Sequence, residues 1–162
     1  MAIFKTVSPK GHYKDDDVYQ NEITYITNPD KAPQEYILAQ GVRSTGTAAQ
    51  DMKALTEFHG KDHGTRILSF DPREPIGCRE AFDIEKQVMD FFAPDYQMVG
   101  AIHVFGKHHL HIHFIMNPVR ISDGKKYKGS REDFYRFLQY LKKLLQKYGC
   151  SCYTISCKNP NV

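Results

Sequence analysis

Residues 101–117 read AIHVFGKHHLHIHFIMN, and this stretch decides how the fold is built. In Leu110–Met116, histidine alternates with apolar residues, which is the pattern of a β-strand whose successive side chains point to opposite faces. His111 and His113 therefore share one face, and the even-numbered residues form the other. We expect the even-numbered face to pack into the core, because all of its side chains are apolar.

The strand before this one carries His103, and the turn between the two strands decides which way that histidine points. A three-residue turn at 106–108 or at 107–109 sets His103 opposite His111 or His113, on the same face. A turn of even length would send His103 to the core. The two odd turns both predict that three imidazoles converge.

Three imidazoles at these positions can occupy one face of a metal ion and leave its other positions for substrate or water. We therefore predict that His103, His111 and His113 bind one divalent ion on the solvent-facing side of the hairpin. The alternative is that these histidines only decorate a solvated strand face.

The rest of the chain alternates between helical and strand patterns. The expected helices are Val18–Thr27, Ala48–His59, Ala81–Phe92 and Arg131–Tyr148, and the expected strands are Ala2–Ser8, Arg66–Phe70, Met98–Phe105, Leu110–Met116 and Tyr153–Ser156. This order predicts an α+β fold in which helices pack on a mostly antiparallel sheet with the histidine hairpin at its centre.

Length and composition favour one domain over residues 1–162, with 41% hydrophobic and 25% charged residues. No apolar run reaches the ~20 residues that span a bilayer, and the N-terminus lacks the apolar stretch of a signal peptide. We therefore expect a cytoplasmic protein without membrane insertion. The cysteines, which we expect to be reduced thiols, are Cys78, Cys150, Cys152 and Cys157.

Basic charge is concentrated in residues 120–147, where nine Lys or Arg residues stand against three acids. Residues 1–119 instead carry 12 basic and 16 acidic residues. Such a segment is either a solvated helix face or a surface that follows phosphates. In the second case, the residues that we expect to contact nucleic acid are Lys125, Lys126, Lys128 and Arg131.

Three motifs resemble those of the HUH endonucleases, and particularly of the relaxases, the mobilisation nucleases of plasmids and integrative elements. H-x7-H-x-H followed by Asn117 resembles their metal motif. ITYITNPDK (23–31) resembles their nucleophile motif, and RILSFDPREP (66–75) resembles the Ser-Phe motif that precedes a helix. The three occur in the family's order, although family members are generally longer.

The resemblance implies an HUH-endonuclease-like fold and nicking of one DNA strand by metal-assisted transesterification, with Tyr25 as the nucleophile. It implies Mn²⁺ or Mg²⁺ as the cofactor, although imidazoles also suit other transition metals. The implied partners are single-stranded DNA at a transfer origin and the accessory proteins of a relaxosome. Further candidates are Ser69 for DNA contact and Asp71, Glu74 and Asn117 as base or as support for the metal ligands.

Three other functions are compatible with the same residues. A rolling-circle replication initiator carries its tyrosine on a helix after the histidines, and Tyr140-Leu-Lys-Lys143 offers that arrangement. A non-catalytic metal-binding or DNA-binding module would use the histidines and the basic segment without a covalent product. A phosphoesterase would use paired histidines as acid and base, usually on two separated strands.

Overall fold

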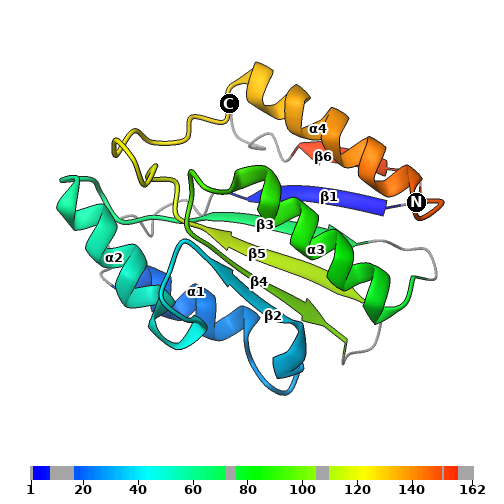
Figure 1. Ribbon diagram of the computed structural model, residues 1–162, viewed down its shortest axis with the longest axis horizontal. Helices are drawn as coiled ribbons and strands as arrows, with labels where there is room; N and C mark the ends of the chain where they lie inside the picture. The colour runs from blue at the N-terminus through cyan, green and yellow to red at the C-terminus, as the bar shows by residue number, and fades with distance from the viewer. Residues whose placement is uncertain (1, 8–16, 72–75, 105–109, 151, 157–162) are drawn as a thin grey trace.

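The computed structural model describes residues 2–7, 17–71, 76–104, 110–150 and 152–156. The helices are α1 (Val18–Ile26), α2 (Ala48–Phe58), α3 (Cys78–Phe92) and α4 (Arg131–Gln146), and the strands are β1 (Ala2–Val7), β2 (Ile37–Gln40), β3 (Arg66–Asp71), β4 (Met98–His103), β5 (His111–Met116) and β6 (Cys152–Ser156). Figure 1 shows these elements as one sheet with helices packed against it. The predicted α+β fold is confirmed.

The sheet has six strands in the order β2-β4-β5-β3-β1-β6. All neighbouring strands are antiparallel except β1 and β6, which run parallel. The β4–β5 hairpin has a neighbour on both sides, so it lies inside the sheet as predicted. No sequence signal predicted β2, because its four residues form too short a run to display a strand period.

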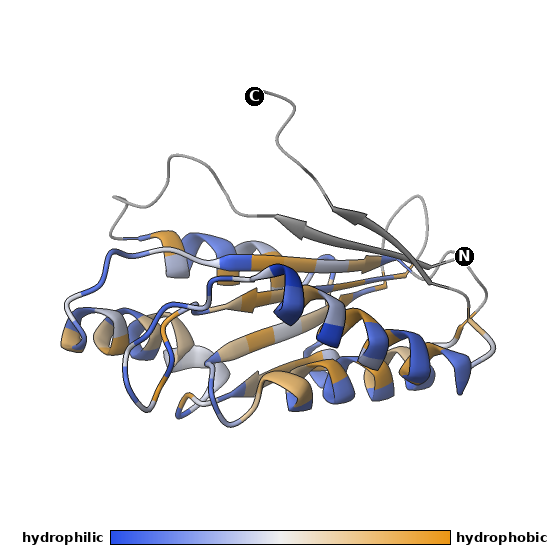
Figure 2. Ribbon diagram, turned by 90° about the horizontal axis from the view of Figure 1, so that it is seen from above, coloured by the Kyte–Doolittle hydropathy of each residue, from blue (hydrophilic) through white to orange (hydrophobic). Residues whose placement is uncertain are grey.

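Helices cover both faces of this sheet, as the turned view in Figure 2 shows. Helices α3 and α4 pack on the face that carries Ile102, Ile112 and Phe114, and form the larger core with it. Helices α1 and α2 pack on the opposite face against Val99, Ala101 and Ile115. The sheet is therefore the central layer of three, and it separates two distinct cores.

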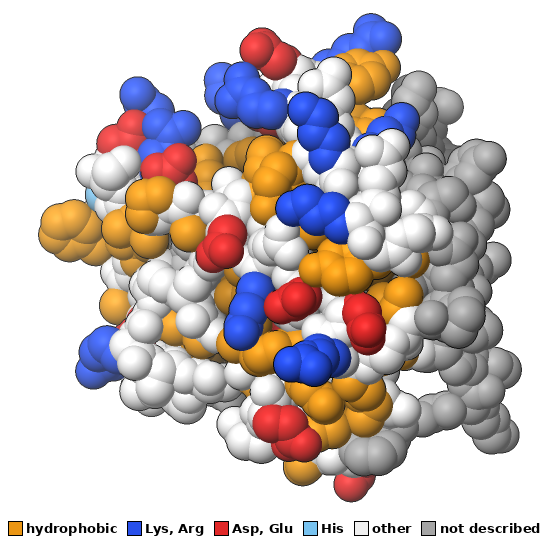
Figure 3. Space-filling model, turned by 45° about the vertical axis from the view of Figure 1, so that its right-hand side comes forward, with side chains coloured by type: hydrophobic (Ala, Val, Ile, Leu, Met, Phe, Trp, Pro, Cys, Tyr) orange, Lys and Arg blue, Asp and Glu red, His pale blue; other side chains and the backbone are white. Residues whose placement is uncertain are grey.

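Helix α4 begins at a capping box, in which the Ser130 hydroxyl accepts from the Asp133 N–H and the Asp133 carboxylate accepts from Ser130. Its buried residues recur at helical spacing and face α3 and the sheet. Its other face is charged, and Figure 3 shows Lys and Arg side chains in the upper part of the molecule, where Figure 1 has α4. The chain leaves the helix through Gly149, whose φ of 69° suits glycine.

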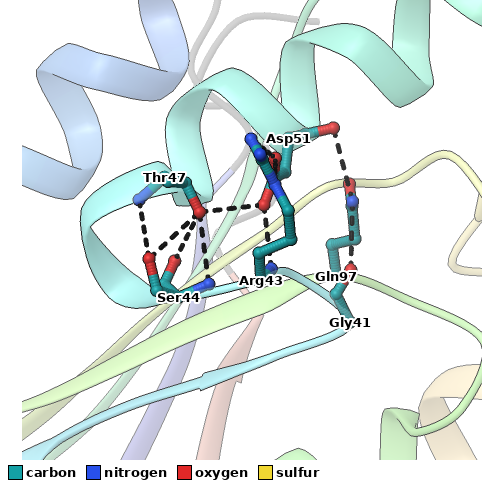
Figure 4. A network of polar contacts seen from close by, with 6 residues as sticks. All are labelled: Gly41, Arg43, Ser44, Thr47, Asp51 and Gln97. Carbon is teal, nitrogen blue, oxygen red and sulfur yellow. Dashed lines mark hydrogen bonds and ion pairs between the residues drawn. The ribbon is translucent and has the colours of Figure 1, made fainter.

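The start of α2 is fixed by a polar network at the turn that follows β2 (Figure 4). Asp51 accepts hydrogen bonds from the backbone N–H and the guanidinium of Arg43, and this guanidinium holds the pKa of the Asp51 carboxyl below its usual range. Gln97 donates to the carbonyl oxygens of Gly41 and Asp51. These bonds tie α2 to the strands beneath it.

Glu85 on α3 is a carboxylic acid inside the larger core. Its side chain is fully buried, and among the described residues neither of its oxygens has a hydrogen-bond partner. It lies over Gly100 of β4, where a Cβ would approach Oε1 to 2.5 Å. Burial raises the pKa of Glu85 to about 9, so the folded protein holds this group protonated at neutral pH.

We expect Glu85 to make folding stability fall as the pH rises. Unfolding releases the proton whenever the pH lies above the ordinary carboxyl value of 4.5, so stability decreases between about pH 4.5 and about pH 9. Glu85→Gln keeps the shape and removes the titration, and should stabilise the protein by a few kcal/mol at pH 8 but little at pH 5. Urea denaturation of both proteins at the two pH values measures this, and an equal difference at both would contradict it.

No helix in the described ranges is long and apolar enough to cross a membrane.

Candidate functional site

The three histidines of the H-x7-H-x-H motif share one face of the β4–β5 hairpin. His103 pairs with His111 across the two strands, and Ala101 pairs with His113. This register is the first of the two that an odd turn allows, although the turn itself lies outside the described residues. Because cross-strand partners point to the same side, the side chains of all three histidines emerge together.

The three imidazole rings form a cluster at the hairpin end of the sheet. The ring centroids of His103 and His113 are 4.3 Å apart, and those of His111 and His113 are 6.1 Å apart. His113 lies in the middle and is the most enclosed of the three. Burial, together with the charges of the two other histidines and of Lys31, lowers the pKa of His113 to about 3.

The histidine face is less solvated than we expected. Val99, Ala101 and Ile115 lie on the same face and are fully buried beneath α1 and α2. The expectation of a solvent-facing hairpin was therefore wrong for most of its length. The reason is that helices cover both sides of the sheet, which leaves the histidines near the open end of the second core.

Helix α1 brings Tyr25 to this cluster. The Nε2–H of His103 donates a 2.8 Å hydrogen bond to the carbonyl oxygen of Ile26, which is the last residue of the helix. The Tyr25 ring lies edge-on to the His103 ring, with centroids 6.3 Å apart. Tyr25 is 57% exposed, whereas Tyr19 on the same helix is buried. One face of α1 thus packs into the core, and Tyr25 remains accessible beside the histidines.

Lys31 also belongs to this region, although we did not predict it as a site residue. Its ammonium nitrogen lies 4.3 Å from the centre of the Tyr25 ring. The Lys31 carbonyl accepts from the backbone N–H of Val104, which anchors the segment after α1 to the end of β4. The signal in the sequence that could have identified Lys31 is the Asn28-Pro29 turn, which brings it back toward Tyr25.

The neighbouring strand β3 adds Ser69 and Asp71 to the same face. Ser69 pairs with His113 across the two strands. The carboxylate of Asp71 lies 3.6 Å from Nε2 of His111. A carboxylate in this position is typical of histidines that bind metal ions, where it helps to orient the ring. Glu74, the other acidic candidate in this motif, lies outside the described residues.

Asn117 does not lie beside the histidines. It is fully buried at the other end of β5, where it donates to the Met52 carbonyl, the Thr56 hydroxyl and the Gln97 side chain. Its carbonyl oxygen accepts from the Val119 N–H. These contacts make Asn117 a tie between α2 and the sheet, so support for the metal ligands is not its role.

Tyr140 lies on the opposite side of the sheet from the histidines. It packs against Phe91 in the α3–α4 layer, and its hydroxyl donates a 2.7 Å hydrogen bond to the Gln87 carbonyl. Tyr19 has a comparable structural role, because its hydroxyl contacts Thr56 at 2.8 Å. Neither tyrosine offers an accessible hydroxyl to the histidine cluster.

The predicted DNA-binding lysines lie at the other end of the sheet from the histidines. Lys125, Lys126 and Lys128 belong to the loop between β5 and α4, which begins where the chain leaves β5. Arg131 opens α4 and lies over the Tyr135 ring. The structure therefore groups Ser69 with the histidines and separates it from the basic residues.

The donor chemistry of the histidine cluster fits a divalent metal ion. Burial also lowers the pKa of His103, so His103 and His113 are neutral imidazoles at physiological pH, the form with a lone pair available for a ligand bond. In the described part of the chain, no three His, Cys, Asp or Glu side chains have their donor atoms arranged for a metal as they stand. A bound ion would compete with the Ile26 carbonyl for Nε2 of His103.

Comparisons with known proteins find a family and a relative that this chain resembles. A family model described as "Relaxase: MobA/VirD2-like, nuclease domain" matches residues 25–150, a range that begins at Tyr25 and includes the three histidines. Protein rlx of Staphylococcus aureus is 34% identical over 84 residues, which make up 49% of this chain and 26% of that protein. The match thus spans about a quarter of the relative's length.

Proposed function

This chain belongs to the family of MobA/VirD2-like relaxase nuclease domains, and from that membership we propose that it nicks one strand of DNA through Tyr25. The observation that carries the proposal is the position of Tyr25, an exposed tyrosine whose ring lies 6.3 Å from that of His103, beside three clustered histidines. A hydroxyl nucleophile next to a metal-binding donor set is what phosphoryl transfer to a tyrosine requires.

The proposed reaction exchanges one phosphodiester for another. The Tyr25 oxygen attacks the scissile phosphorus and loses its proton, and the departing 3′ oxygen of the neighbouring nucleotide takes one up. The products are a 5′-phosphotyrosyl strand and a free 3′-hydroxyl. Because the energy of the broken bond is kept in the new one, the same residues can rejoin the strand.

His103, His111 and His113 would hold the divalent ion, for which Mn²⁺ and Mg²⁺ are our candidates. When bound, such an ion withdraws charge from the scissile phosphate and stabilises the transition state. Asp71 would hold the His111 ring in place through the contact at 3.6 Å, and Ser69 would support His113 or touch the strand. Asp71 is also a candidate for the base that accepts the phenol proton, and it is the one of the two acidic candidates in its motif that lies within the described residues.

Lys31 would contribute positive charge beside the nucleophile. Its ammonium group is close enough to the Tyr25 ring to attract both a phenolate and a phosphate oxygen. We assign it an electrostatic role in holding the scissile phosphate against Tyr25.

The biological setting that we propose is conjugative mobilisation in the cytoplasm, with single-stranded DNA at a transfer origin as substrate and relaxosome proteins as partners. The match to Protein rlx supports this setting for the nuclease part. The replication-initiator alternative is disfavoured because Tyr140 lies across the sheet from the histidines, with its hydroxyl already donated. A phosphoesterase or a non-catalytic binder leaves the exposed Tyr25 without a role.

Covalent capture tests the proposal. The protein is incubated with labelled single-stranded oligonucleotides that cover a candidate transfer origin, with and without Mn²⁺, and run on a denaturing gel. We expect a labelled band at the mass of the protein plus the 5′-linked strand, and no such band in EDTA. Cleavage without a covalent band would support a nuclease that uses water, and would overturn the role of Tyr25.

A further inference from the structure

A cavity separate from the histidine cluster lies at the end of the sheet where β4 begins and β5 ends. Its volume is about 750 Å³, within the range of pockets that hold small-molecule ligands. The walls come from the end of α3, the Asp95-Tyr96 segment, the loop between β5 and α4, and the first turns of α4. The proposed cleavage reaction uses none of these residues.

Aromatic rings form the floor of this cavity. Phe91 and Tyr127 are half-buried, and Phe92 and Tyr96 are buried behind them. The Tyr96 and Tyr127 rings meet edge-on with centroids 5.5 Å apart, and Tyr127 also meets Phe92 edge-on. Rings of this kind offer flat apolar surface to a nucleic-acid base of any sequence.

Basic side chains surround the aromatic floor. They are Lys61, Arg120, Lys125, Lys126, Lys128 and Arg136. Two acids line the same cavity, and one of them, Asp133, accepts hydrogen bonds from the Ser130 N–H and hydroxyl. The upper part of the face in Figure 3 shows Lys and Arg side chains with apolar surface between them. Acids beside the lining offset part of this charge, because Asp123 pairs with Arg120 and Lys125, and Glu132 pairs with Arg136. The charge that remains is positive and favours an anion with an apolar part.

The loop that carries three of these lysines has a defined backbone. Val119 and Lys126 form an antiparallel bridge, and the Arg120 N–H donates to the Lys125 carbonyl. Gly124 closes the turn with a φ of 70° and packs directly on His59, where any side chain would overlap the imidazole. The loop thus presents its lysines from a fixed position over the end of α2.

The cavity is remote from the histidine cluster. Met98 pairs with Met116 at one end of the hairpin, and His103 pairs with His111 at the other. Five residue steps separate these pairs, or about 17 Å along the strands. The aromatic floor belongs to the core on the α3–α4 side, whereas the histidines face α1 and α2. A ligand in the cavity cannot touch the histidines directly.

We propose that this cavity is a second DNA site, which holds one nucleotide of a single strand with its base on the aromatic floor and its phosphates on the basic rim. The proposal rests on the proposed function only in naming DNA as the ligand. A strand held here extends beyond the cleavage site by at least several nucleotides. The cavity therefore anchors the substrate at a distance from Tyr25 and acts on affinity rather than on the chemical step.

A binding experiment without divalent ions tests the rim. The probe is a fluorescein-labelled oligothymidylate of about 20 nucleotides, longer than typical single-strand sites of about 4–16 nucleotides. We expect Lys125, Lys126 and Lys128 changed together to Gln to weaken binding at least tenfold and to flatten the slope of log affinity against log salt by about 2. Fluorescence anisotropy at several salt concentrations gives both values.

The matched control removes the same charge from the same basic segment, outside the cavity. Lys142, Lys143 and Lys147 changed together to Gln should alter the slope far less, because they lie at the distal end of α4 and just after it, outside the cavity. Equal effects of the two triple variants on DNA affinity would overturn the proposed site, because they would show that DNA is attracted by basic charge spread over the surface. A labelled oligoglutamate peptide that binds, and depends on the cavity lysines while DNA does not, would instead show a protein partner.

A second measurement tests the floor. An oligonucleotide in which abasic sites replace every base has the same phosphates, so only stacking distinguishes it from oligothymidylate. We expect the wild-type protein to bind the abasic strand at least about tenfold more weakly than oligothymidylate. Tyr127→Leu should reduce this difference in affinity between the two strands, whereas Tyr127→Phe should keep it. Equal binding of both strands by the wild-type protein would contradict base insertion without any variant.

The outcome is separable from that of the proposed function. These measurements need neither a metal ion nor Tyr25, and covalent capture needs no cavity lysine. A covalent band, together with equal effects of the two triple variants on DNA binding, would overturn the proposed cavity site alone. Cavity-dependent binding without a covalent band under any metal would overturn the nicking proposal alone.

Discussion

Tyr25→Phe should abolish the covalent product between protein and DNA while it leaves the affinity for single-stranded DNA nearly unchanged. The substitution removes one oxygen, and this oxygen is the proposed nucleophile. Loss of a nucleophile costs many orders of magnitude in rate, here about 10⁴-fold or more. The phenyl ring keeps its packing beside His103 and beneath Lys31, so the local structure is preserved.

Tyr135→Phe is the matched control for that variant. Tyr135 is another exposed tyrosine, with 49% of its surface accessible, and it lies on α4 in the layer across the sheet from the histidines. Tyr140→Phe serves the same purpose for the replication-initiator alternative. Both variants should form the adduct at the wild-type rate. An adduct that survives Tyr25→Phe and disappears with Tyr140→Phe would reverse our assignment.

His111→Ala and His113→Ala should each remove most of the affinity for Mn²⁺ and most of the nicking activity. Each imidazole supplies one of three proposed ligand bonds, so we expect the dissociation constant for Mn²⁺ to rise about 100-fold or more. Isothermal titration calorimetry measures the metal affinity directly. His111→Ala should destabilise the fold less than His113→Ala, because His111 is partly exposed and its removal leaves a smaller cavity.

His63→Ala is the control for the histidine variants. His63 is largely enclosed, with its ring beside Tyr19 and a 3.2 Å hydrogen bond between Nε2 and the Glu57 carboxylate, but it lies outside the cluster. It should lose some stability and retain both Mn²⁺ affinity and nicking. If His63→Ala weakened Mn²⁺ binding as much as His111→Ala, the metal site would lie elsewhere.

The elements with a strong period were predictable from sequence. The apolar stripe of α4 and the alternation in β5 each identify one element. The face of His103 was predictable only for a turn of odd length, and the observed pairing of His103 with His111 is one of the two that such a turn allows. Strand β2 was missed because four residues are too few to show an alternation of polar and apolar side chains. Only its pairing with β4 identifies it as a strand. Pairing with distant segments has no local signal.

The site was predictable in part for the same reason. Strand parity brings His103, His111 and His113 together, but it says nothing about what covers them. The burial of His113 under α1 depends on packing between elements that are distant in sequence, and so does the approach of Lys31 to Tyr25. Asn117 was misread because its place in a motif was visible while its buried partners were not.

The measurement that tests the central claim most directly is peptide mapping of the covalent product by mass spectrometry. The adduct is formed with a labelled single strand and Mn²⁺, digested with nuclease and protease, and searched for a tyrosine that carries a 5′-nucleotide remnant. Our account predicts the remnant on the peptide that contains Tyr25 and on no other peptide. A remnant on Tyr140 or Tyr135, or strand cleavage with no modified tyrosine, would contradict it.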